Sequence, residues 1–322
     1  MSPISTSHRR TRAPRRLRHL AIAAAVVLAA ALALLPFRFA SAAGETVNIW
    51  LTTTNDAGGR NVTRGLQQQA PIAFAGSSAG ANQTVTVDEN TRFQQFTGAG
   101  ASFTDTAAWL MNSSGALTPG TRDATMTKLF DPNNGIGLSF LRNPMGASDL
   151  ARFNYTYDDT CCDLGDFSIG HDLADVLPLT RQARTINPAV TVMATPWTAP
   201  AWMKDNNSFD QGWLQSQYYA LYAQYFVKYV QGYAQQNVKI DYVTPQNEPT
   251  CCPGYPSMNW NASGLDFFTV HSLYPALRGA NLRTKVLVLD WNWSAWNGFG
   301  AAQVADTALR NDPNFGGIAW HG

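Results

Sequence analysis

The sequence predicts an α/β fold in which helices connect the strands of a parallel sheet. From residue 93 onward, short apolar runs alternate with helical stretches, which is typical of strand-helix-strand units. The strand candidates are residues 96–100, 137–142, 190–196, 240–245, 285–290 and 317–321. Several of them end in polar or aromatic residues, as expected in a (β/α)8 TIM barrel, where the carboxyl ends of the strands line one site.

The first 42 residues are typical of a secretory signal peptide. They contain seven arginines and no acidic residue, with an apolar run over residues 20–35 and then Ala40-Ser41-Ala42. The apolar run is shorter than the roughly 20 residues of a membrane-spanning helix. We therefore expect a secreted protein without stable membrane insertion, the alternative being an anchor that is retained.

The charge of the mature chain argues against nucleic-acid binding. The whole chain has a formal net charge of +1, and removal of residues 1–42 with their seven arginines changes it to −6. Because the arginine cluster lies in the signal peptide, no basic groove for a nucleic acid is expected.

Residues 43–95 are expected to form a small β segment ahead of the barrel, which we assign to residues 96–322. Residues 46–54 and the alternating residues 84–88 have the pattern of strands, and a Gly-Gly turn is expected at 58–59. The N-terminal segment is thus predicted to be part of a side β domain.

The clearest helix covers residues 217–235. Its tyrosines recur every three or four residues, at Tyr218, Tyr222, Tyr225, Tyr229 and Tyr233. This face could be a platform for sugars, but an aromatic stripe of this period more often packs on a sheet. We expect it to belong to the core.

The four cysteines form two adjacent pairs, Cys161-Cys162 and Cys251-Cys252. Disulfides are expected in an exported protein. Because neighbouring cysteines bridge each other only with strain, we expect cross-pairing between the two loops, with the connectivity open. A metal site is the alternative, but no histidine lies close to either pair in sequence, and we expect no metal.

Five strand candidates are ended or followed by residues suited to a binding site. These are Arg142 and Asp149 for the second candidate, Trp197 for the third, Asn247 and Glu248 for the fourth, Asp290 for the fifth and His321 for the sixth. In a barrel such positions converge, whatever their distance in sequence. A structural barrel without a site is therefore the less favoured interpretation.

Glu248 is the strongest catalytic candidate. The chain contains only three glutamates, Glu45, Glu89 and Glu248, and the last follows an apolar strand within Thr244-Pro-Gln-Asn-Glu-Pro249. A carboxylic acid there can protonate the leaving oxygen of a glycoside, and the amide of Asn247 can bind the 2-hydroxyl of the sugar. The pattern predicts glycoside hydrolysis with Glu248 as general acid/base.

Several longer motifs follow one another along nearly the whole mature chain. They are Phe93-Gln-Gln-Phe-Thr-Gly-Ala-Gly-Ala-Ser-Phe-Thr-Asp105, Leu141-Arg-Asn-Pro-Met-Gly-Ala-Ser-Asp149, Ala194-Thr-Pro-Trp-Thr-Ala-Pro-Ala-Trp-Met-Lys204, and Val243-Thr-Pro-Gln-Asn-Glu-Pro249 with Gly254-Tyr-Pro256. Together they resemble glycoside hydrolase family 30, the retaining β-glycosidases that include glucosylceramidases and β-1,6-glucanases. The Gly-Tyr-Pro loop is more similar to the glucosylceramidase and glucanase branch than to the xylanase branch.

The resemblance implies a role for each strand-end residue. Glu248 would be the acid/base, and Asn247 would contact the 2-hydroxyl. Asp149 and Trp197 would grip the sugar, Arg142 would lie near the nucleophile, and Asp290 and His321 would line the pocket.

Three of these residues have alternative explanations. Arg142 could form a structural ion pair, and Trp197 could belong to the core. His321 is the penultimate residue and could be frayed.

The resemblance also implies a residue that this sequence does not contain. A retaining enzyme needs a second carboxylate about 5 Å from the first, and in the family it is a glutamate at the end of the seventh strand. The sequence stops at Gly322, and Glu45 and Glu89 belong to the N-terminal segment, so no nucleophile is present in the chain. We therefore expect a fragment with an incomplete barrel of about six of the eight strands, inactive by itself.

The favoured function is a secreted β-glycosidase that acts on a β-linked glucoside or glucan. It needs no cofactor, since two carboxylates suffice for this chemistry. The alternative is a non-catalytic carbohydrate-binding remnant that uses Trp197, Asp149 and Asn247. Glucosylceramide, β-1,6-glucan and related β-glycosides are the substrate candidates.

Overall fold

The computed structural model describes residues 44–55, 61–75, 82–83, 85–250 and 253–322. The predicted signal peptide and the Gly-Gly turn at 58–59 lie outside the described residues. The chain divides into two units, Met1–Phe93 and Gln94–Gly322. In the described parts of the chain, no helix is long and apolar enough to span a bilayer.

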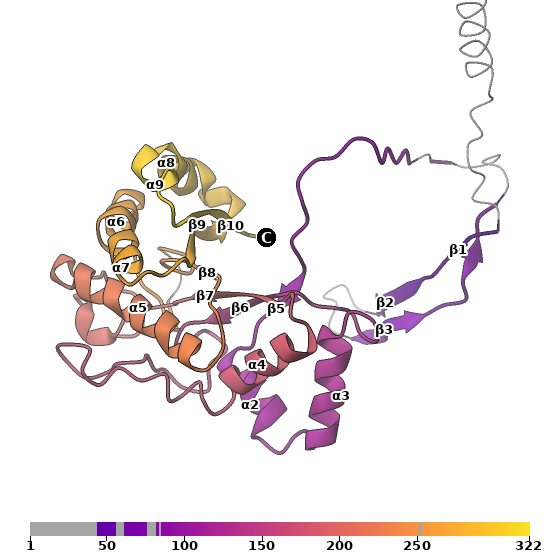
Figure 1. Cartoon of the computed structure of the whole chain (residues 1–322), viewed down its shortest axis with the longest axis horizontal. Helices are drawn as coiled ribbons and strands as arrows, with labels where there is room; N and C mark the ends of the chain where they lie inside the picture. Colours follow the sequence, from indigo (N-terminus) through magenta and orange to yellow (C-terminus); the bar gives the residue numbers. More distant parts are fainter. Residues whose placement is uncertain (1–43, 56–60, 76–81, 84, 251–252) are drawn as a thin grey trace, which may run out of the picture. The chain divides into compact units, whose positions relative to one another are not determined.

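The first unit contains two small antiparallel sheets (Figure 1). One pairs β1 (Thr46–Val47) with β4 (Ile72–Ala73), and the other pairs β2 (Trp50–Thr54) with β3 (Val62–Gln68). Nearly all residues of these strands are exposed. The first unit therefore has little core of its own.

The strand expected at residues 84–88 was wrong. Residues 85–88 form no strand, and the side chains of Val85 and Val87 are 86% and 79% exposed. The Asp88 carboxylate instead accepts a hydrogen bond from the backbone N–H of Asn90 and one from the Thr91 hydroxyl. An alternating pattern makes a strand only where a partner strand pairs with its edge and another layer covers its apolar face.

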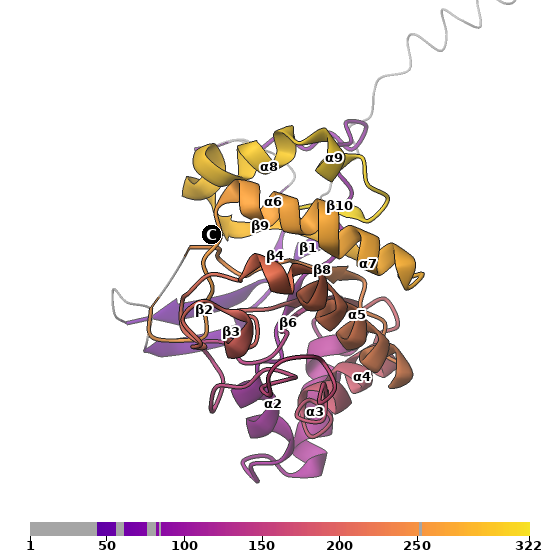
Figure 2. The same ribbon diagram turned by 90° about the vertical axis from the view of Figure 1, so that its left-hand side faces the viewer.

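The second unit is built on one parallel sheet of six strands in the order β10-β9-β8-β7-β6-β5. The strands are β5 (Gly100–Ala101), β6 (Phe140–Pro144), β7 (Thr191–Thr195), β8 (Tyr242–Val243), β9 (Lys285–Asn292) and β10 (Phe315–His321). Every pair of neighbours is parallel. The sheet is curled and open, with β5 and β10 at its edges, which confirms an incomplete barrel (Figures 1 and 2).

The first barrel strand is shorter and later than expected. It begins at Gly100 rather than at residue 96, and the Phe96 side chain is 79% exposed. A Cβ atom at Gly100 would overlap the carbonyl oxygen of Phe140 in β6. Glycine is thus what allows β5 to approach β6 closely.

Helices connect the strands and cover the outer side of the sheet (Figure 2). They are α2 (Asp105–Asn112), α3 (Pro119–Phe130), α4 (Val176–Ile186), α5 (Tyr219–Gln235), α6 (Ala262–Phe268), α7 (Tyr274–Gly279), α8 (Ala301–Ala305) and α9 (Thr307–Arg310). Shorter turns are η1 (Ala201–Met203), η2 (Ser216–Tyr218), η3 (Thr269–Leu273), η4 (Trp293–Ala295) and η5 (Trp296–Gly300). Several helices begin at a side-chain cap, as where Thr104 accepts from the N–H of Ala107.

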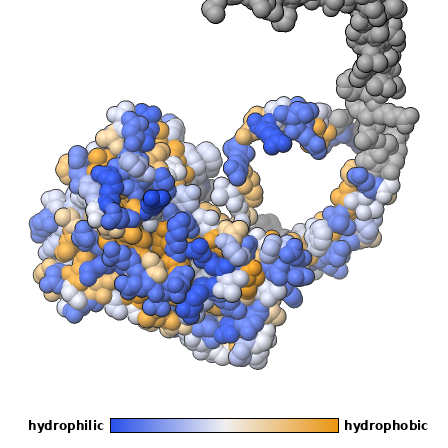
Figure 3. Space-filling view, in the orientation of Figure 1, coloured by the Kyte–Doolittle hydropathy of each residue, from blue (hydrophilic) through white to orange (hydrophobic). Residues whose placement is uncertain are grey.

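The tyrosine face of α5 belongs to the core, as predicted. Tyr222, Tyr225, Tyr229 and Tyr233 are completely buried. The helix begins at Tyr219 because the preceding residues form the 3₁₀ turn η2. On the visible face of this unit, apolar residues are interspersed among polar ones (Figure 3).

Candidate active site

The carboxyl ends of β6 to β10 bring six of the seven predicted site residues together. Arg142 lies within β6, Trp197 follows β7, and Asn247 and Glu248 follow β8. Asp290 lies near the end of β9, and His321 is the last residue of β10. Arg142 and His321 are 179 residues apart in sequence, yet their side chains are in contact.

Asp290 is the buried centre of this cluster. Its carboxylate accepts bonds of 3.0 and 2.9 Å from Nη2 of Arg142 and bonds of 2.6 and 2.7 Å from the hydroxyls of Thr195 and Thr244. Burial alone would raise the pKa of Asp290, but the Arg142 charge and the bonds from His321 and Thr195 lower it to about 2. Asp290 is therefore ionised at neutral pH, and it orients the groups around it.

His321 connects Asp290 to the catalytic candidate. Its Nε2 lies 2.9 Å from Oδ1 of Asp290, and its Nδ1 lies 2.9 Å from Oε1 of Glu248. Burial lowers the pKa of His321, but the bonds to Asp290 and Glu248 outweigh it and raise the pKa above 6.5. Both ring nitrogens of His321 thus have a carboxyl partner, and the contact of Nδ1 fixes the position of Glu248. His321 is not frayed.

The backbone around Glu248 is held in an unusual conformation. Glu248 and Asp290 have φ angles of 45° and 46°, in the left-handed region that few residues other than glycine adopt. The Glu248 N–H donates to the Asp290 carbonyl at 3.0 Å, and the Asn247 N–H donates to the Pro196 carbonyl at 2.9 Å. Left-handed residues held by such bonds are common at functional sites.

Asn247 and Trp197 both contact Arg142. Nη2 of Arg142 donates to Oδ1 of Asn247 at 2.7 Å, and the guanidinium carbon lies 5.1 Å from the centre of the Trp197 ring. Trp197 is 8% exposed, so most of its surface packs inside the protein. Arg142 forms an ion pair with Asp290, so the structural ion pair expected as an alternative exists and is part of the cluster.

Asp149 is the predicted site residue that stands apart. It is exposed on the loop after β6 and makes no hydrogen bond to the cluster within the described residues. Burial raises the pKa of the Tyr255 phenol. The charges of Glu248 and Asp149 raise that pKa further.

Sequence reasoning missed two threonines of the site. Thr195 and Thr244 both donate to the same oxygen of Asp290, and they also contact each other. A signal was available, because each stands in a Thr-Pro pair at the end of a strand, Thr195-Pro196 and Thr244-Pro245. Repetition of one dipeptide at the ends of neighbouring strands predicts a shared structural role.

The cysteine prediction was wrong for the first pair. Cys161 and Cys162 are joined to each other by a disulfide, with their Cα atoms 3.1 Å apart across a cis peptide bond. The cis bond brings the two side chains to the same side of the chain, so no partner from another loop is required. Cys251 and Cys252 lie outside the described residues. Within the described ranges, no group of histidine, cysteine and acidic residues is placed to hold a metal ion.

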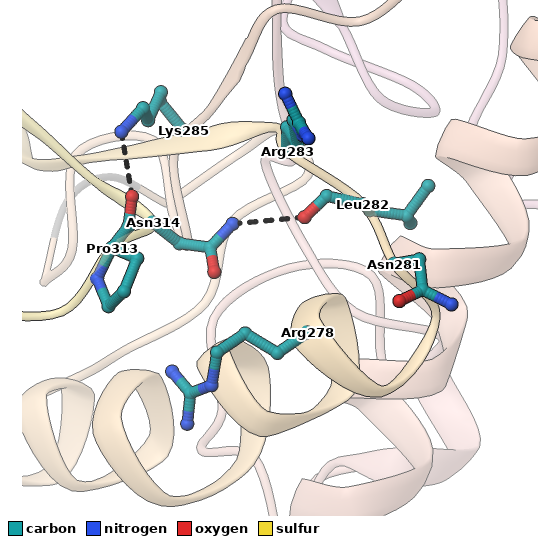
Figure 4. A pocket seen from close by; sticks show the side chains of 7 residues that line it. All are labelled: Arg278, Asn281, Leu282, Arg283, Lys285, Pro313 and Asn314. Atoms are coloured by element: carbon teal, nitrogen blue, oxygen red, sulfur yellow. Dashed lines mark hydrogen bonds between the residues drawn. The ribbon is translucent and has the colours of Figure 1, made fainter.

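A cavity lies away from this cluster, near the start of β9. It has a volume of about 460 Å³ and is lined by Arg278, Arg283, Lys285 and Asn314, among others (Figure 4). Lys285 is the first residue of β9, so this cavity lies at the opposite strand ends from Asp290. In a barrel that end contributes to stability, and catalysis belongs to the other.

The cluster has the chemistry of a proton-transfer site. The imidazole of His321 holds the carboxyl group of Glu248. The buried, ionised Asp290 fixes His321, and Arg142 fixes the neighbouring amide of Asn247. Such an arrangement can give a proton to an oxygen atom and take one from water.

Comparisons with known proteins agree with this chemistry. Residues 96–321 match the glycosyl hydrolase family 30 TIM-barrel domain. The chain is 31% identical to an endo-1,6-β-D-glucanase of Trichoderma harzianum, over 74% of this chain and 51% of that protein. It is also 31% identical to the lysosomal acid glucosylceramidase of Mus musculus, over 70% and 46% of the two chains.

A solved structure gives the same result. The endo-β1,6-glucanase BT3312 superposes with a TM-score of 0.70 and 29% identity, over 81% of this chain and 58% of that one. The chain spans about half the length of the curated relatives that it matches. On the match to the family domain and on these relatives, the chain belongs to glycosyl hydrolase family 30.

Proposed function

We propose that this chain carries the acid/base part of a secreted, retaining β-glycosidase of the glucosylceramidase and β-1,6-glucanase type. The observation that supports this most strongly is Glu248, held by His321 at the carboxyl ends of the strands beside Asn247. Secretion is proposed from residues 1–42, whose arginines and apolar run are typical of a signal peptide.

In this proposal Glu248 moves the proton. It protonates the glycosidic oxygen as the leaving group departs, and then takes a proton from the water that attacks the glycosyl intermediate. His321 holds one oxygen of Glu248 and keeps the carboxyl group aimed at the same point in both steps.

Asn247 would bind the sugar through its amide nitrogen. Its Oδ1 already accepts from Arg142 at 2.7 Å, so Nδ2 is the end of the amide that can donate to a hydroxyl. A bond to the 2-hydroxyl strengthens in the transition state and contributes to catalysis. Trp197 and Asp149 would bind other parts of the same glucosyl unit.

Asp290 is unsuited to be the nucleophile. It is 1% exposed, and Arg142, His321, Thr195 and Thr244 all bond its carboxylate. We propose that the nucleophilic carboxylate is supplied by protein outside residues 1–322. These residues alone are then expected to bind a β-glucoside without hydrolysing it.

The substrate we propose is a β-linked glucoside or glucan, such as a β-1,6-glucan or glucosylceramide. The relatives are named as a 1,6-β-glucanase and a glucosylceramidase, and the substrates in both names contain a glucosyl unit. The residues at the carboxyl ends of the strands would bind that unit.

The acid/base role is tested with Glu248→Gln in the full-length gene product. We expect hydrolysis of an alkyl β-glucoside to fall about 10²- to 10⁴-fold, because glutamine cannot donate the proton. Glu89→Gln is the matched control, since Glu89 is exposed in the N-terminal segment. Unchanged hydrolysis in Glu248→Gln would contradict the role.

The alternative function is carbohydrate binding without catalysis, and measurements of binding and turnover distinguish it from the glycosidase. Binding of gentiobiose, a β-1,6-linked glucose disaccharide, is measured by calorimetry on residues 1–322 and on the full-length product. Turnover by the full-length product supports the glycosidase. Binding by both without any turnover supports the binding protein, and absence of binding contradicts both.

A further inference from the structure

Lys204 is a buried lysine outside the catalytic cluster. It follows η1, directly after the Trp197 loop, and it is 2% exposed. Its backbone is fixed by a β-bridge to Leu214. A lysine is almost never buried so completely unless its amino group has partners.

The partners of Lys204 are two backbone carbonyls from different loops. Nζ donates to the carbonyl of Gln211 at 2.7 Å and to that of Ser257 at 3.0 Å. Gln211 lies in the loop after η1, and Ser257 lies in the loop after Glu248. One amino group therefore joins the loop after β7 to the loop after β8.

Further bonds connect the same two loops. The carboxylate of Asp210 accepts from the N–H of Gly254 at 2.9 Å and from the Ser257 hydroxyl at 2.9 Å. The N–H of Ser257 donates to the Phe209 carbonyl at 2.9 Å. Lys204 is buried beneath this contact, while Asp210 is only partly buried.

The loop that Lys204 holds carries Tyr255. Burial raises the pKa of the Tyr255 phenol, and the Glu248 and Asp149 charges raise it further. Residues 254–259 follow Glu248 closely in sequence, so their attachment to residues 205–215 bears on the loop that carries the acid/base.

We propose that Lys204 is a positioning residue of the active site, whose Nζ fastens residues 254–259 to residues 205–215 and so holds the loop that follows Glu248. The inference rests on the proposed role of Glu248. Lys204 would act through these loops, since its Nζ donates to the backbone carbonyls of Gln211 and Ser257.

The chemistry of the amino group fits two acceptors. A neutral amine has two N–H donors, as many as the carbonyls that it meets. Burial lowers the pKa of Lys204 to about 7, against smaller opposing effects of the Asp210 and Asp205 charges. An unfolded lysine keeps its proton up to about 10.5, so the folded arrangement around Lys204 gains stability as pH rises from about 7 to 10.5.

Hydrogen exchange of residues 1–322 tests the proposal. Lys204→Met keeps an apolar stem but removes the donors, and we expect amides in residues 253–259 to exchange about 10-fold faster. Exchange in α5 stays unchanged. Lys239→Met is the matched control, since Lys239 has 69% of its side chain exposed, and it leaves the loop unaffected. Unchanged exchange of residues 253–259 in Lys204→Met overturns the proposal.

A second measurement decides the matter if Lys204→Met loses its fold. In the native chain, protection of residues 253–259, corrected for the intrinsic rate, rises between about pH 6 and about pH 9. In Lys204→Gln, which carries no titrating group there, the rise is absent. A native profile without the rise, or the same rise in Lys204→Gln, overturns the proposal.

Gentiobiose binding links the loop to the site. We expect the dissociation constant to rise at least about 10-fold in Lys204→Met and to stay constant in Lys239→Met. Equal affinity in native protein and Lys204→Met contradicts the positioning of the site by Lys204. Failure of the native chain to bind contradicts the proposed function instead, and the exchange data still decide whether Lys204 holds the loop.

Discussion

Two buried aspartates of this protein have opposite electrostatics. Asp290, in the active-site cluster, and Asp172, beneath α5, are each 1% exposed. Asp290 meets the cationic Arg142 and the imidazole of His321, and its pKa falls to about 2. Asp172 instead accepts from the hydroxyls of Tyr157 and Tyr233, both at 2.5 Å, and burial raises its pKa.

The comparison shows that burial does not by itself determine the state of a carboxyl group. Burial raises the pKa at both positions, and a full positive charge within bonding distance reverses the effect only at Asp290. The tyrosine hydroxyls around Asp172 lower its pKa too little to do so. Asp290 organises the site, and Asp172 joins α5 to the loop before α4 through Tyr233.

The largest effect is expected from removing the cation. Arg142→Met leaves the Asp290 charge buried without its ion-pair partner, and we expect unfolding free energy to fall by about 3–5 kcal/mol. Urea titration of residues 1–322 measures it. Arg278→Met is the control, since its pair with Asp312 is more exposed than the pair of Arg142 with Asp290, and its loss should cost less than about 1 kcal/mol. An equal loss of unfolding free energy in Arg142→Met and Arg278→Met would contradict the special role of the Arg142–Asp290 pair.

The two aspartates should respond oppositely to pH. The depressed pKa of Asp290 contributes stability above its ordinary value of 3.8, and this is lost as pH falls toward about 2. The raised pKa of Asp172 contributes stability below 3.8, and this is lost as pH rises through the folded pKa.

The destabilisation caused by Asp290→Asn should therefore shrink on acidification, and that caused by Asp172→Asn should shrink as the medium becomes less acidic. Urea titrations of both variants and the native chain at several acidic pH values check this. Parallel profiles for the two variants would contradict the comparison.

Substitution of His321 is expected to change the free energy of unfolding by a smaller amount. Its raised pKa contributes stability below about pH 6.5 that is lost as pH rises through the folded value. His321→Gln should cost about 1 kcal/mol under acidic conditions and less at alkaline pH. His271→Gln on η3 is a control. A cost that grows with pH would mean that the imidazole is not protonated between the two carboxylates.

The sequence predicted the parts of this protein that follow from simple periodicity. Six apolar runs became the six parallel strands, and the tyrosines at helical spacing became the buried face of α5. The polar residues at strand ends converged, because strands of one parallel sheet end on the same side.

The parts that escaped prediction depend on contacts distant in sequence. The first strand begins only at Gly100, where β6 is close, and residues 85–88 have no partner strand. Thr195 and Thr244 became site residues because Asp290 lies between their strands. The pairing of Cys161 with Cys162 depends on a backbone conformation that no composition rule predicts.

The central claim, that the ionised Asp290 cluster is the sugar site and the Asp172 cluster is scaffold, is tested most directly by carboxyl ¹³C NMR. Spectra of residues 1–322 are recorded against pH with and without gentiobiose, and Asp290→Asn and Asp172→Asn assign the signals. We predict that Asp290 titrates near pH 2 and Asp172 above 3.8, and that gentiobiose shifts the Asp290 signal alone. An Asp290 that titrates above 3.8, or a sugar that shifts only Asp172, would contradict the account.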